Sequence, residues 1–158
     1  KVWPLVRQRV PDAPASVCGN CCASLHAPDD SVRLQGRVAG LGSYYERADV
    51  CVVPLLAGSG MKIKMVDALS RGAAGVATAV GMQGLEGGAG SAFLHADGPE
   101  AFAAAVVQLM QDKPLRDRLR QRAAAFVEAQ LAPDVAFREL RDAICGSRAG
   151  SWRVMAER

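Results

Sequence analysis

Short apolar and β-branched runs alternate with helical patterns along most of the chain, and this alternation constrains the fold more than any other feature. Such an order is typical of β–α units, in which helices cover both faces of a parallel sheet. We therefore expect the α/β class, with a Rossmann-like, mainly parallel sheet flanked by helices. The expected strands are residues 15–18, 32–34, 50–53, 75–78 and 92–94.

The run at residues 50–53 is the clearest strand, because an unbroken apolar run ended by Pro54 is typical of a strand buried on both faces. We expect it at the centre of the sheet. Helices are expected between the strands and after the last one, and the final three open with a proline, which fits the first turn of a helix. The helical ranges are 2–9, 41–48, 62–71, 99–111, 114–130 and 133–144.

The length of 158 residues and a hydrophobic content of 50% fit one domain with a sufficient apolar core. We expect a single Rossmann-like domain over residues 1–145 and a tail over residues 146–158. A formal net charge of +3 is too small and too dispersed to indicate a nucleic-acid partner. No apolar stretch reaches the length of a membrane span, and the first residues lack the core of a signal peptide, so we expect a cytoplasmic protein.

A glycine-rich turn follows the strand expected at 50–53 and leads into the next helix. It contains Gly58, Ser59, Gly60, Met61 and Lys62. Ligands of open parallel sheets bind where such turns leave the carboxyl ends of strands, and unpaired amides at a helix start favour anions. A lysine there opposes the helix dipole by about 0.3–1 kcal/mol unless an anion is bound. The turn is a candidate diphosphate site; the alternative is a flexible turn with a solvated lysine.

Asp67 lies on the helix after this turn, and it shares one polar stripe with Lys64 and Arg71. Its carboxylate could accept hydrogen bonds from two vicinal sugar hydroxyls, as acidic residues do at nucleotide sites, or it could form an exposed ion pair. The residues expected to face inward are Ile63, Val66 and Leu69.

Two further motifs leave alternatives open. A second glycine-rich turn, residues 81–85, would lie on the same edge of the sheet, where it could close over a ligand or form a plain loop. Cys18 and Cys21 form a C-x-x-C pattern that suggests redox exchange or half of a zinc site, but no second ligand pair follows at metal-binding spacing. We therefore expect no metal site and mostly reduced cysteines.

Several short motifs follow one another in a distinctive order. They are Val2-Trp3-Pro4, Gly36-Arg37-Val38, Tyr44-Tyr45-Glu46-Arg47-Ala48-Asp49-Val50, Val53-Pro54-Leu55, Gly58-Ser59-Gly60-Met61-Lys62, Asp67-Ala68-Leu69-Ser70-Arg71-Gly72 and Gly84-Leu85. At these spacings the chain, from about residue 2 to residue 144, resembles the C-terminal, nucleotide-sugar-binding domain of GT-B glycosyltransferases. The resemblance is to the retaining, family-4 type known as glycosyl transferases group 1.

The resemblance implies a hexosyltransferase-type reaction, in which a nucleotide-diphosphate sugar is the donor substrate and no separate cofactor is needed. It implies that the turn from Gly58 to Lys62 contacts the donor phosphate and sugar, and that Asp67 stands where a Glu normally holds the ribose. The other implied donor contacts are Val38 and Tyr44 on the base side and Gly81, Gly84 and Leu85 near the diphosphate.

The implied acceptor is a glycan or a lipid-linked sugar, bound by an N-terminal domain that would precede Lys1, so the protein could lie at the inner face of the membrane. The family's first strand, which is central in its sheet, would also precede Lys1. Without that strand, residues 15–18 and 50–53 lack a shared neighbour. We expect the two half-sheets either to meet directly or to be joined by another segment.

One departure from the family pattern concerns the acids around the helix at 62–71. Many members carry two Glu residues eight positions apart, where this chain has Ser59 and Asp67. The chain alone is expected not to catalyse transfer, because GT-B chemistry takes place between two domains. A non-catalytic scaffold or partner-binding module of the same fold is the main alternative, which Ser59 favours slightly. A sugar-nucleotide epimerase-like protein is another.

Overall fold

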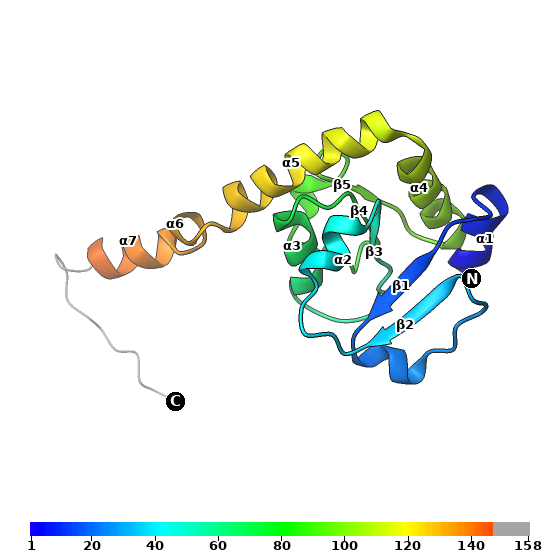
Figure 1. Ribbon diagram of the computed structural model, residues 1–158. Coiled ribbons are helices and arrows are strands. Elements are labelled where there is room, and N and C mark those ends of the chain that lie inside the picture. The colour runs from blue at the N-terminus through cyan, green and yellow to red at the C-terminus, as the bar shows by residue number, and fades with distance from the viewer. Residues whose placement is uncertain (147–158) are drawn as a thin grey trace.

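The structure is a computed structural model that describes residues 1–146 (Figure 1). The tail expected at 146–158 lies outside the described residues apart from Gly146, which ends the last helix. The strands are β1 (Ala15–Cys18), β2 (Val32–Gly36), β3 (Cys51–Val53), β4 (Gly75–Ala77) and β5 (Phe93–His95). The helices are α1 (Val2–Arg9), α2 (Gly42–Arg47), α3 (Ile63–Ser70), α4 (Pro99–Gln111), α5 (Lys113–Leu131), α6 (Pro133–Ala136) and α7 (Arg138–Gly146).

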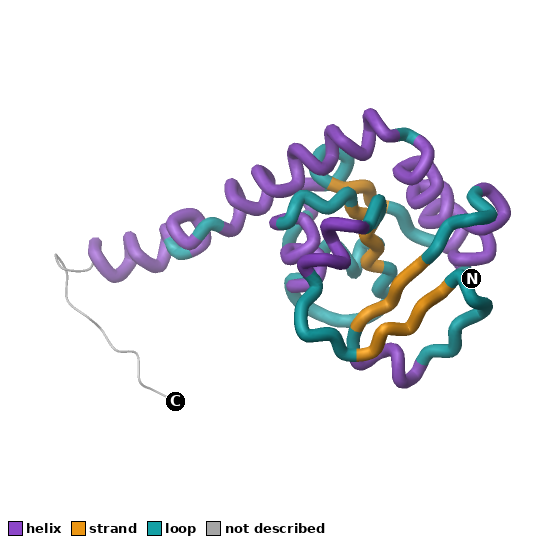
Figure 2. The backbone as a smooth tube through the Cα atoms, viewed as in Figure 1, coloured by secondary structure: helices purple, strands orange, loops and turns teal. Residues whose placement is uncertain are grey.

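All strand pairs are parallel, but the strands form two sheets rather than one (Figure 2). The smaller sheet pairs β1 with β2, and the larger has the order β3-β4-β5. Each strand overlaps an expected run, so the alternation in the sequence located the strands correctly. The α/β architecture with helix-flanked parallel strands is therefore confirmed.

The expected position of β3 is wrong. Within the described residues β3 pairs only with β4 and lies at the edge of its sheet, and the side chain of Val52 is 48% exposed. An apolar run predicts a strand with buried side chains, but it does not reveal whether that strand has a neighbouring strand on each side. The centre of the three-stranded sheet is β4, all of whose residues are buried.

The expectation that the two half-sheets meet or are joined is also wrong for residues 1–146. No ladder links β1 to β3, and residues 1–14 form α1 and a loop rather than a strand. Helix α1 instead packs against α4. Both β1 and β3 therefore keep one edge without a strand partner in the described part of the chain.

Two clusters of buried side chains cover opposite faces of the larger sheet. Val76 belongs to the cluster that includes Val6 of α1 and Leu109 of α4, whereas the next residue, Ala77, belongs to the cluster around Met65. Successive residues of a strand point to opposite faces, so helices protect both sides of β4. Burial of each large apolar side chain contributes about 1.5–3 kcal/mol. The larger sheet is consequently the firm platform from which the loops described below extend.

The proline-initiated helices are present, with one correction. The helix expected at 133–144 is two helices, α6 and α7, because Phe137 leaves helical geometry with φ −103° and ψ 10°. Both project away from the body of the molecule (Figure 1). No residue from 14 to 52 is fully buried, so the smaller sheet and α2 contribute little to the core.

Candidate functional site

Two loops leave the carboxyl ends of neighbouring strands at one rim of the larger sheet. We call residues 54–62, between β3 and α3, the first rim loop, and residues 78–85, after β4, the second rim loop. Because β3 and β4 are parallel, both loops start at the same edge of the sheet. This edge is where ligands of open α/β sheets bind.

Backbone amides of the first rim loop make no hydrogen bond within the described part of the chain. From Leu55 to Lys62, no backbone N–H donates a hydrogen bond to any described residue. Gly58 and Gly60 have φ angles of 122° and 69°, which side-chain-bearing residues rarely adopt. The loop is exposed from residue 56 to residue 61 and leads directly into the first turn of α3. This arrangement brings unpaired N–H groups and the positive end of a helix dipole to one place.

Lys62 is positioned differently from a solvated lysine at the end of a helix. Its side chain is 7% exposed, and its ammonium donates to the carbonyl oxygens of Ser59 at 2.9 Å and Gly60 at 2.7 Å. The third donor bonds to Oε1 of Gln83 at 3.0 Å. An ammonium has three donors, so all are engaged within the protein. A direct bond from Lys62 to an anion would have to replace one of these contacts.

The second rim loop packs closely under the first. Gly81 is buried and donates its N–H to Oγ1 of Thr78 at 3.0 Å, and a Cβ atom at Gly81 would lie 2.4 Å from the Val53 carbonyl oxygen. Leu85 is 1% exposed and belongs to the core. Gly84, with φ 81°, stays at the surface beside Met61. Of these predicted donor contacts, the structure therefore places Gly84 at the surface and Gly81 and Leu85 in packing positions.

Asp67 forms part of a polar cluster between α2 and α3. Its Oδ1 accepts a hydrogen bond from Nε of Arg71 at 3.0 Å, which is the expected ion pair on one helix face. The hydroxyl of Tyr45 is near enough to this carboxylate to be influenced by its charge. Burial, followed by the negative charge of Asp67, raises the pKa of Tyr45 to about 12. The Asp67 side chain is 34% exposed, so it remains accessible to a ligand hydroxyl.

The inward face of α3 differs from the expected one at its first residue. Ile63, the first residue of α3, is 81% exposed and does not face the core. Val66 is partly buried and packs against the core, as expected. The fully buried residues of α3 are Met65, Ala68 and Leu69.

The two residues predicted on the base side are separated. Val38 lines a pocket of about 300 Å³ at the carboxyl ends of β1 and β2. Tyr44 is not among its lining residues and instead lies under the guanidinium of Arg47, 5.7 Å from the ring centroid. The residues that line this pocket with Val38 are Cys18, Gly19, Asn20, Arg37 and Leu41.

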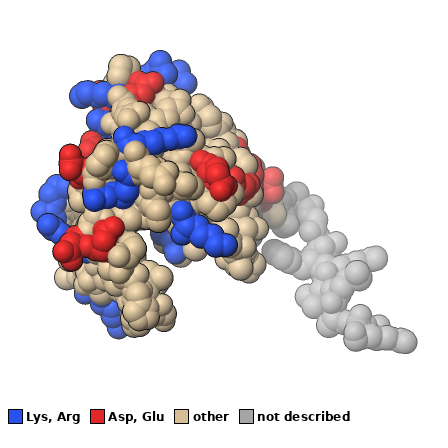
Figure 3. All heavy atoms as spheres, turned by 90° about the vertical axis from the view of Figure 1, so that its right-hand side faces the viewer, with Lys and Arg blue, Asp and Glu red and all other residues tan. Residues whose placement is uncertain are grey.

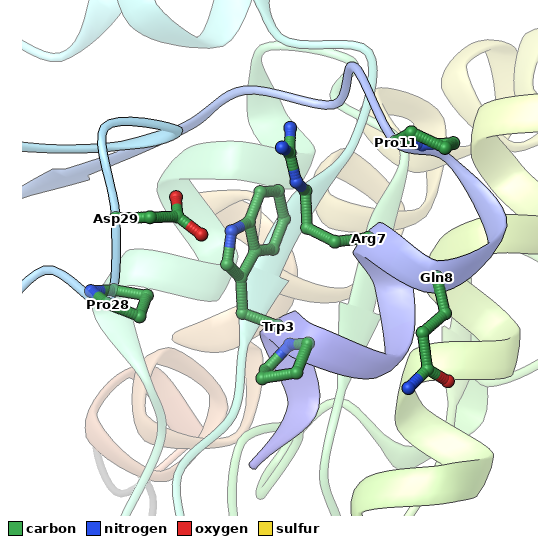
Figure 4. Close-up of a pocket in the computed structure, with 7 residues that line it drawn as sticks. Trp3, Arg7, Gln8, Pro11, Pro28 and Asp29 are labelled. Carbon is green, nitrogen blue, oxygen red and sulfur yellow. The ribbon is translucent and has the colours of Figure 1, made fainter.

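A second pocket, of about 400 Å³, lies at the opposite end of the smaller sheet, before β2 begins, and Figure 4 shows its lining residues. Three of its polar side chains already have partners within the chain. Nε1 of Trp3 donates to Oγ of Ser31 at 2.9 Å, Arg7 donates to the Ala13 carbonyl oxygen at 3.2 Å, and Asp29 accepts from the Ser31 amide at 2.8 Å. This pocket lies at the other end of the smaller sheet from the pocket beside Val38, and the polar atoms of Trp3, Arg7 and Asp29 named above are used within the chain.

Sequence reasoning missed three residues that organise these sites. Gln83 lies inside the second glycine-rich turn, but nothing in the sequence connects it with a lysine 21 positions earlier. Tyr45 follows the predicted Tyr44, and only the register of α2 decides which ring meets Asp67. Arg37 was part of a recognised motif, which was the one available signal for its place in the pocket.

Charge and metal ligands do not indicate another kind of site. Acidic and basic side chains are interspersed on the face shown in Figure 3. Among residues 1–146, no three His, Cys, Asp or Glu side chains are grouped to hold a metal ion. The helices of the described part include none that is long and apolar enough to cross a bilayer.

Comparison with solved structures gives a clear match in fold. A glycosyltransferase from Rickettsia africae ESF-5 is similar with a TM-score of 0.73 and 11% sequence identity. The match covers 93% of this chain and 44% of that protein's chain, so this chain spans less than half of its length. At this identity the likeness shows the fold alone. Comparison with curated proteins gave no match.

A family model gives the most specific result. The model described as "Glycosyl transferases group 1" matches residues 1–112. The matched region contains both rim loops, Asp67 and the pocket beside Val38, as well as all five strands. The chain therefore belongs to the group 1 glycosyltransferase family.

Proposed function

We propose that the first rim loop binds the diphosphate of a nucleotide-sugar donor and that the chain is the donor-binding part of a hexosyltransferase. The observation that carries this proposal is the run of unpaired backbone amides from Leu55 to Lys62 at the start of α3. Amide groups at a helix start are well suited to a phosphate, because they supply both hydrogen bonds and a positive dipole. Membership of the family favours a sugar nucleotide over other anions.

The buried ammonium of Lys62 stabilises the conformation of the same loop. The ammonium donates hydrogen bonds to the Ser59 and Gly60 carbonyl oxygens, and these bonds use none of the amide N–H groups of the loop. We infer that the amides bind the ligand. The positive charge of Lys62 is also shielded from water, and a charge in such surroundings acts over a longer distance than an exposed one. We infer that Lys62 favours the diphosphate mainly through its charge and through the shape it gives the loop.

We assign the binding sites of the ribose and the base of the sugar nucleotide from the positions of nearby residues. Asp67 binds the ribose hydroxyls with the part of its carboxylate that Arg71 leaves accessible, and the pocket beside Val38 receives the base. The acceptor glycan or lipid-linked sugar binds an N-terminal domain, and the chain on its own does not catalyse transfer. We place the protein in the cytoplasm, where nucleotide sugars serve as donors.

A non-catalytic module is a second candidate, and two observations favour it. Ser59 cannot supply the negative charge that many family members carry at this position, and every donor of the Lys62 ammonium is already engaged. The two candidates differ in whether bound donor is consumed. Release of UDP from UDP-glucose by the protein together with an acceptor-binding domain would support the transferase.

Isothermal titration calorimetry with UDP-glucose, GDP-mannose and ADP-glucose tests the donor site. We expect one of them to bind, and we expect Lys62→Ala to weaken that binding at least tenfold, or about 1.4 kcal/mol. Lys113→Ala is the matched control, because it removes an exposed lysine from α5. Circular dichroism of each variant establishes that it is folded. The absence of heat with all three donors and with free UDP, GDP and ADP would contradict the proposal.

A further inference from the structure

Three cysteines cluster where β1 ends. Cys18 is the last residue of β1, and Cys21 and Cys22 lie on a short 3-10 helix over Asn20–Ser24. The sulfur of Cys21 is 3.9 Å from the Cys18 carbonyl oxygen, and the sulfur of Cys22 is 3.2 Å from the Val17 carbonyl oxygen. All three are free thiols that surround the same turn.

Gly19 allows the turn to bring Cys21 back toward Cys18. Its φ angle is 118°, and a Cβ atom at this position would lie 3.9 Å from the Cys21 sulfur, so that sulfur lies over the glycine. Cys18 and Cys21 are separated by two residues, which is the spacing of redox-active C-x-x-C motifs. The adjacent pair Cys21 and Cys22 lacks this spacing, because a single peptide bond joins the two residues.

The two thiols of the C-x-x-C pair have different surroundings. Cys21 is exposed and therefore meets a dissolved oxidant first, whereas Cys18 is half-buried. Burial, followed by the nearby charges of Cys22 and Cys21, raises the pKa of the Cys18 thiol. The raised pKa keeps more of Cys18 in the less reactive thiol form, which leaves the exposed Cys21 as the first of the pair to react.

Cys18 also forms part of the wall of the pocket that contains Arg37 and Val38. Gly19 and Asn20, the two residues between the cysteines, line the same pocket. A bond between Cys18 and Cys21 would turn the Cys18 side chain toward the 3-10 helix and constrain Gly19 and Asn20. The pocket wall would then change shape with the state of the thiols.

We propose that Cys18 and Cys21 are a hydroperoxide-sensitive dithiol that forms a disulfide and thereby closes the pocket beside Val38 to a nucleotide base. Hydrogen peroxide first transfers one oxygen to the Cys21 thiolate and leaves as water after taking up a proton, which gives a sulfenic acid. The Cys18 thiolate then attacks that sulfur, the S–S bond forms, and hydroxide leaves and is protonated. In total, two thiols and one peroxide give one disulfide and two waters.

Peptide mass mapping of the reduced chain before and after stoichiometric hydrogen peroxide tests the covalent step. Trypsin releases the three cysteines in one peptide, since no Lys or Arg lies between Arg9 and Arg33. We expect this peptide to become lighter by two hydrogen atoms in the natural chain and in Cys22→Ser, but not in Cys18→Ser or Cys21→Ser. Loss of the hydrogens in Cys21→Ser, or no loss in the natural chain, would overturn the assigned pair. This readout does not depend on any ligand.

The effect on the pocket rests on the proposed function and is measured separately. We expect UDP, GDP or ADP to raise the melting temperature of the reduced chain, and we expect that shift to be lost after oxidation and to return with dithiothreitol. An unchanged shift in a chain with the mapped disulfide would overturn closure of the pocket. If no nucleotide shifts the reduced chain, the proposed donor site is wrong, while the mapped disulfide decides the dithiol assignment by itself.

Discussion

The ammonium nitrogen of Lys62 lies 3.0 Å from Oε1 of Gln83 and donates a hydrogen bond to it, which joins the two rim loops across 21 positions of sequence. The other two donors of that ammonium bond to carbonyl oxygens of the first rim loop. One buried side chain therefore fixes both the conformation of the first rim loop and its distance from the second. The shape of the proposed donor site depends on this contact.

Removal of the Gln83 acceptor is expected to destabilise the fold. In Gln83→Leu one donor of the buried Lys62 ammonium loses its partner, and an unpaired buried donor costs about 1–3 kcal/mol. Urea denaturation measures the free energy of unfolding. The control Gln121→Leu changes an exposed glutamine on α5 and should shift this free energy by less than about 0.5 kcal/mol. Equal effects of the two changes would contradict the role given to Gln83.

Gly81→Ala is expected to lower the melting temperature, because the new methyl group would lie 2.4 Å from the Val53 carbonyl oxygen. Relief of such a clash requires the second rim loop to move away from β3, and overpacking of this kind costs about 1–3 kcal/mol. Gly40→Ala is the matched control, since a Cβ there has no atom within 4 Å. Thermal denaturation followed by circular dichroism distinguishes the two variants. A melting temperature for Gly81→Ala equal to that of Gly40→Ala would show that the loop does not pack as described.

Arg116 is expected to stabilise the junction between α4 and α5. Its Nη1 donates to the Leu109 and Met110 carbonyl oxygens at 2.7 and 3.0 Å, and its Nη2 lies 3.3 Å from Asp49. Arg116→Met leaves those carbonyl oxygens unpaired and should cost about 1–3 kcal/mol in urea denaturation. Arg118→Met, an exposed change on the same helix, should have little effect. Partial recovery in Arg116→Lys would separate loss of the donor from loss of side-chain volume.

The raised pKa of Tyr45 predicts a loss of stability at high pH. The unfolded tyrosine loses its proton near pH 10, whereas the folded one keeps it to about 12, so the unfolded state binds fewer protons between these values. The free energy of unfolding should therefore fall as pH rises from 10 to 12, and this slope should be smaller in Tyr45→Phe. Absorbance at about 295 nm reports the phenolate directly. Asp67→Asn should lower the pKa of Tyr45, because the carboxylate is the main charge that raises it. An unchanged titration would contradict this electrostatic coupling.

The sequence was sufficient to locate the strands and helices, because their apolar periods depend only on neighbouring residues. It could not show that β3 is an edge strand, since Val52 is apolar whether or not a further strand covers it. The break at Phe137 was hidden for a similar reason, because an amphipathic pattern continues across it. These features depend on contacts between distant segments, which a local pattern does not record.

The candidate site could likewise be predicted from the sequence only in part. Positions of the glycines in both rim loops follow from the motifs, and the free amides of the first loop agree with a glycine-rich turn. The direction of the Lys62 side chain does not follow, because a long flexible chain can turn outward or inward and Gln83 decides between them. The ring that meets Asp67 likewise depends on how α2 is rotated against α3.

Among residues 1–146, β1 and β3 each have one edge without a strand partner, and this has a practical consequence for work with the protein. Rows of free N–H and C=O groups on a strand are templates for the strands of neighbouring molecules. Self-association should therefore rise with protein concentration even far below the melting temperature. Purified material is best stored dilute, and light scattering should precede any titration at high concentration.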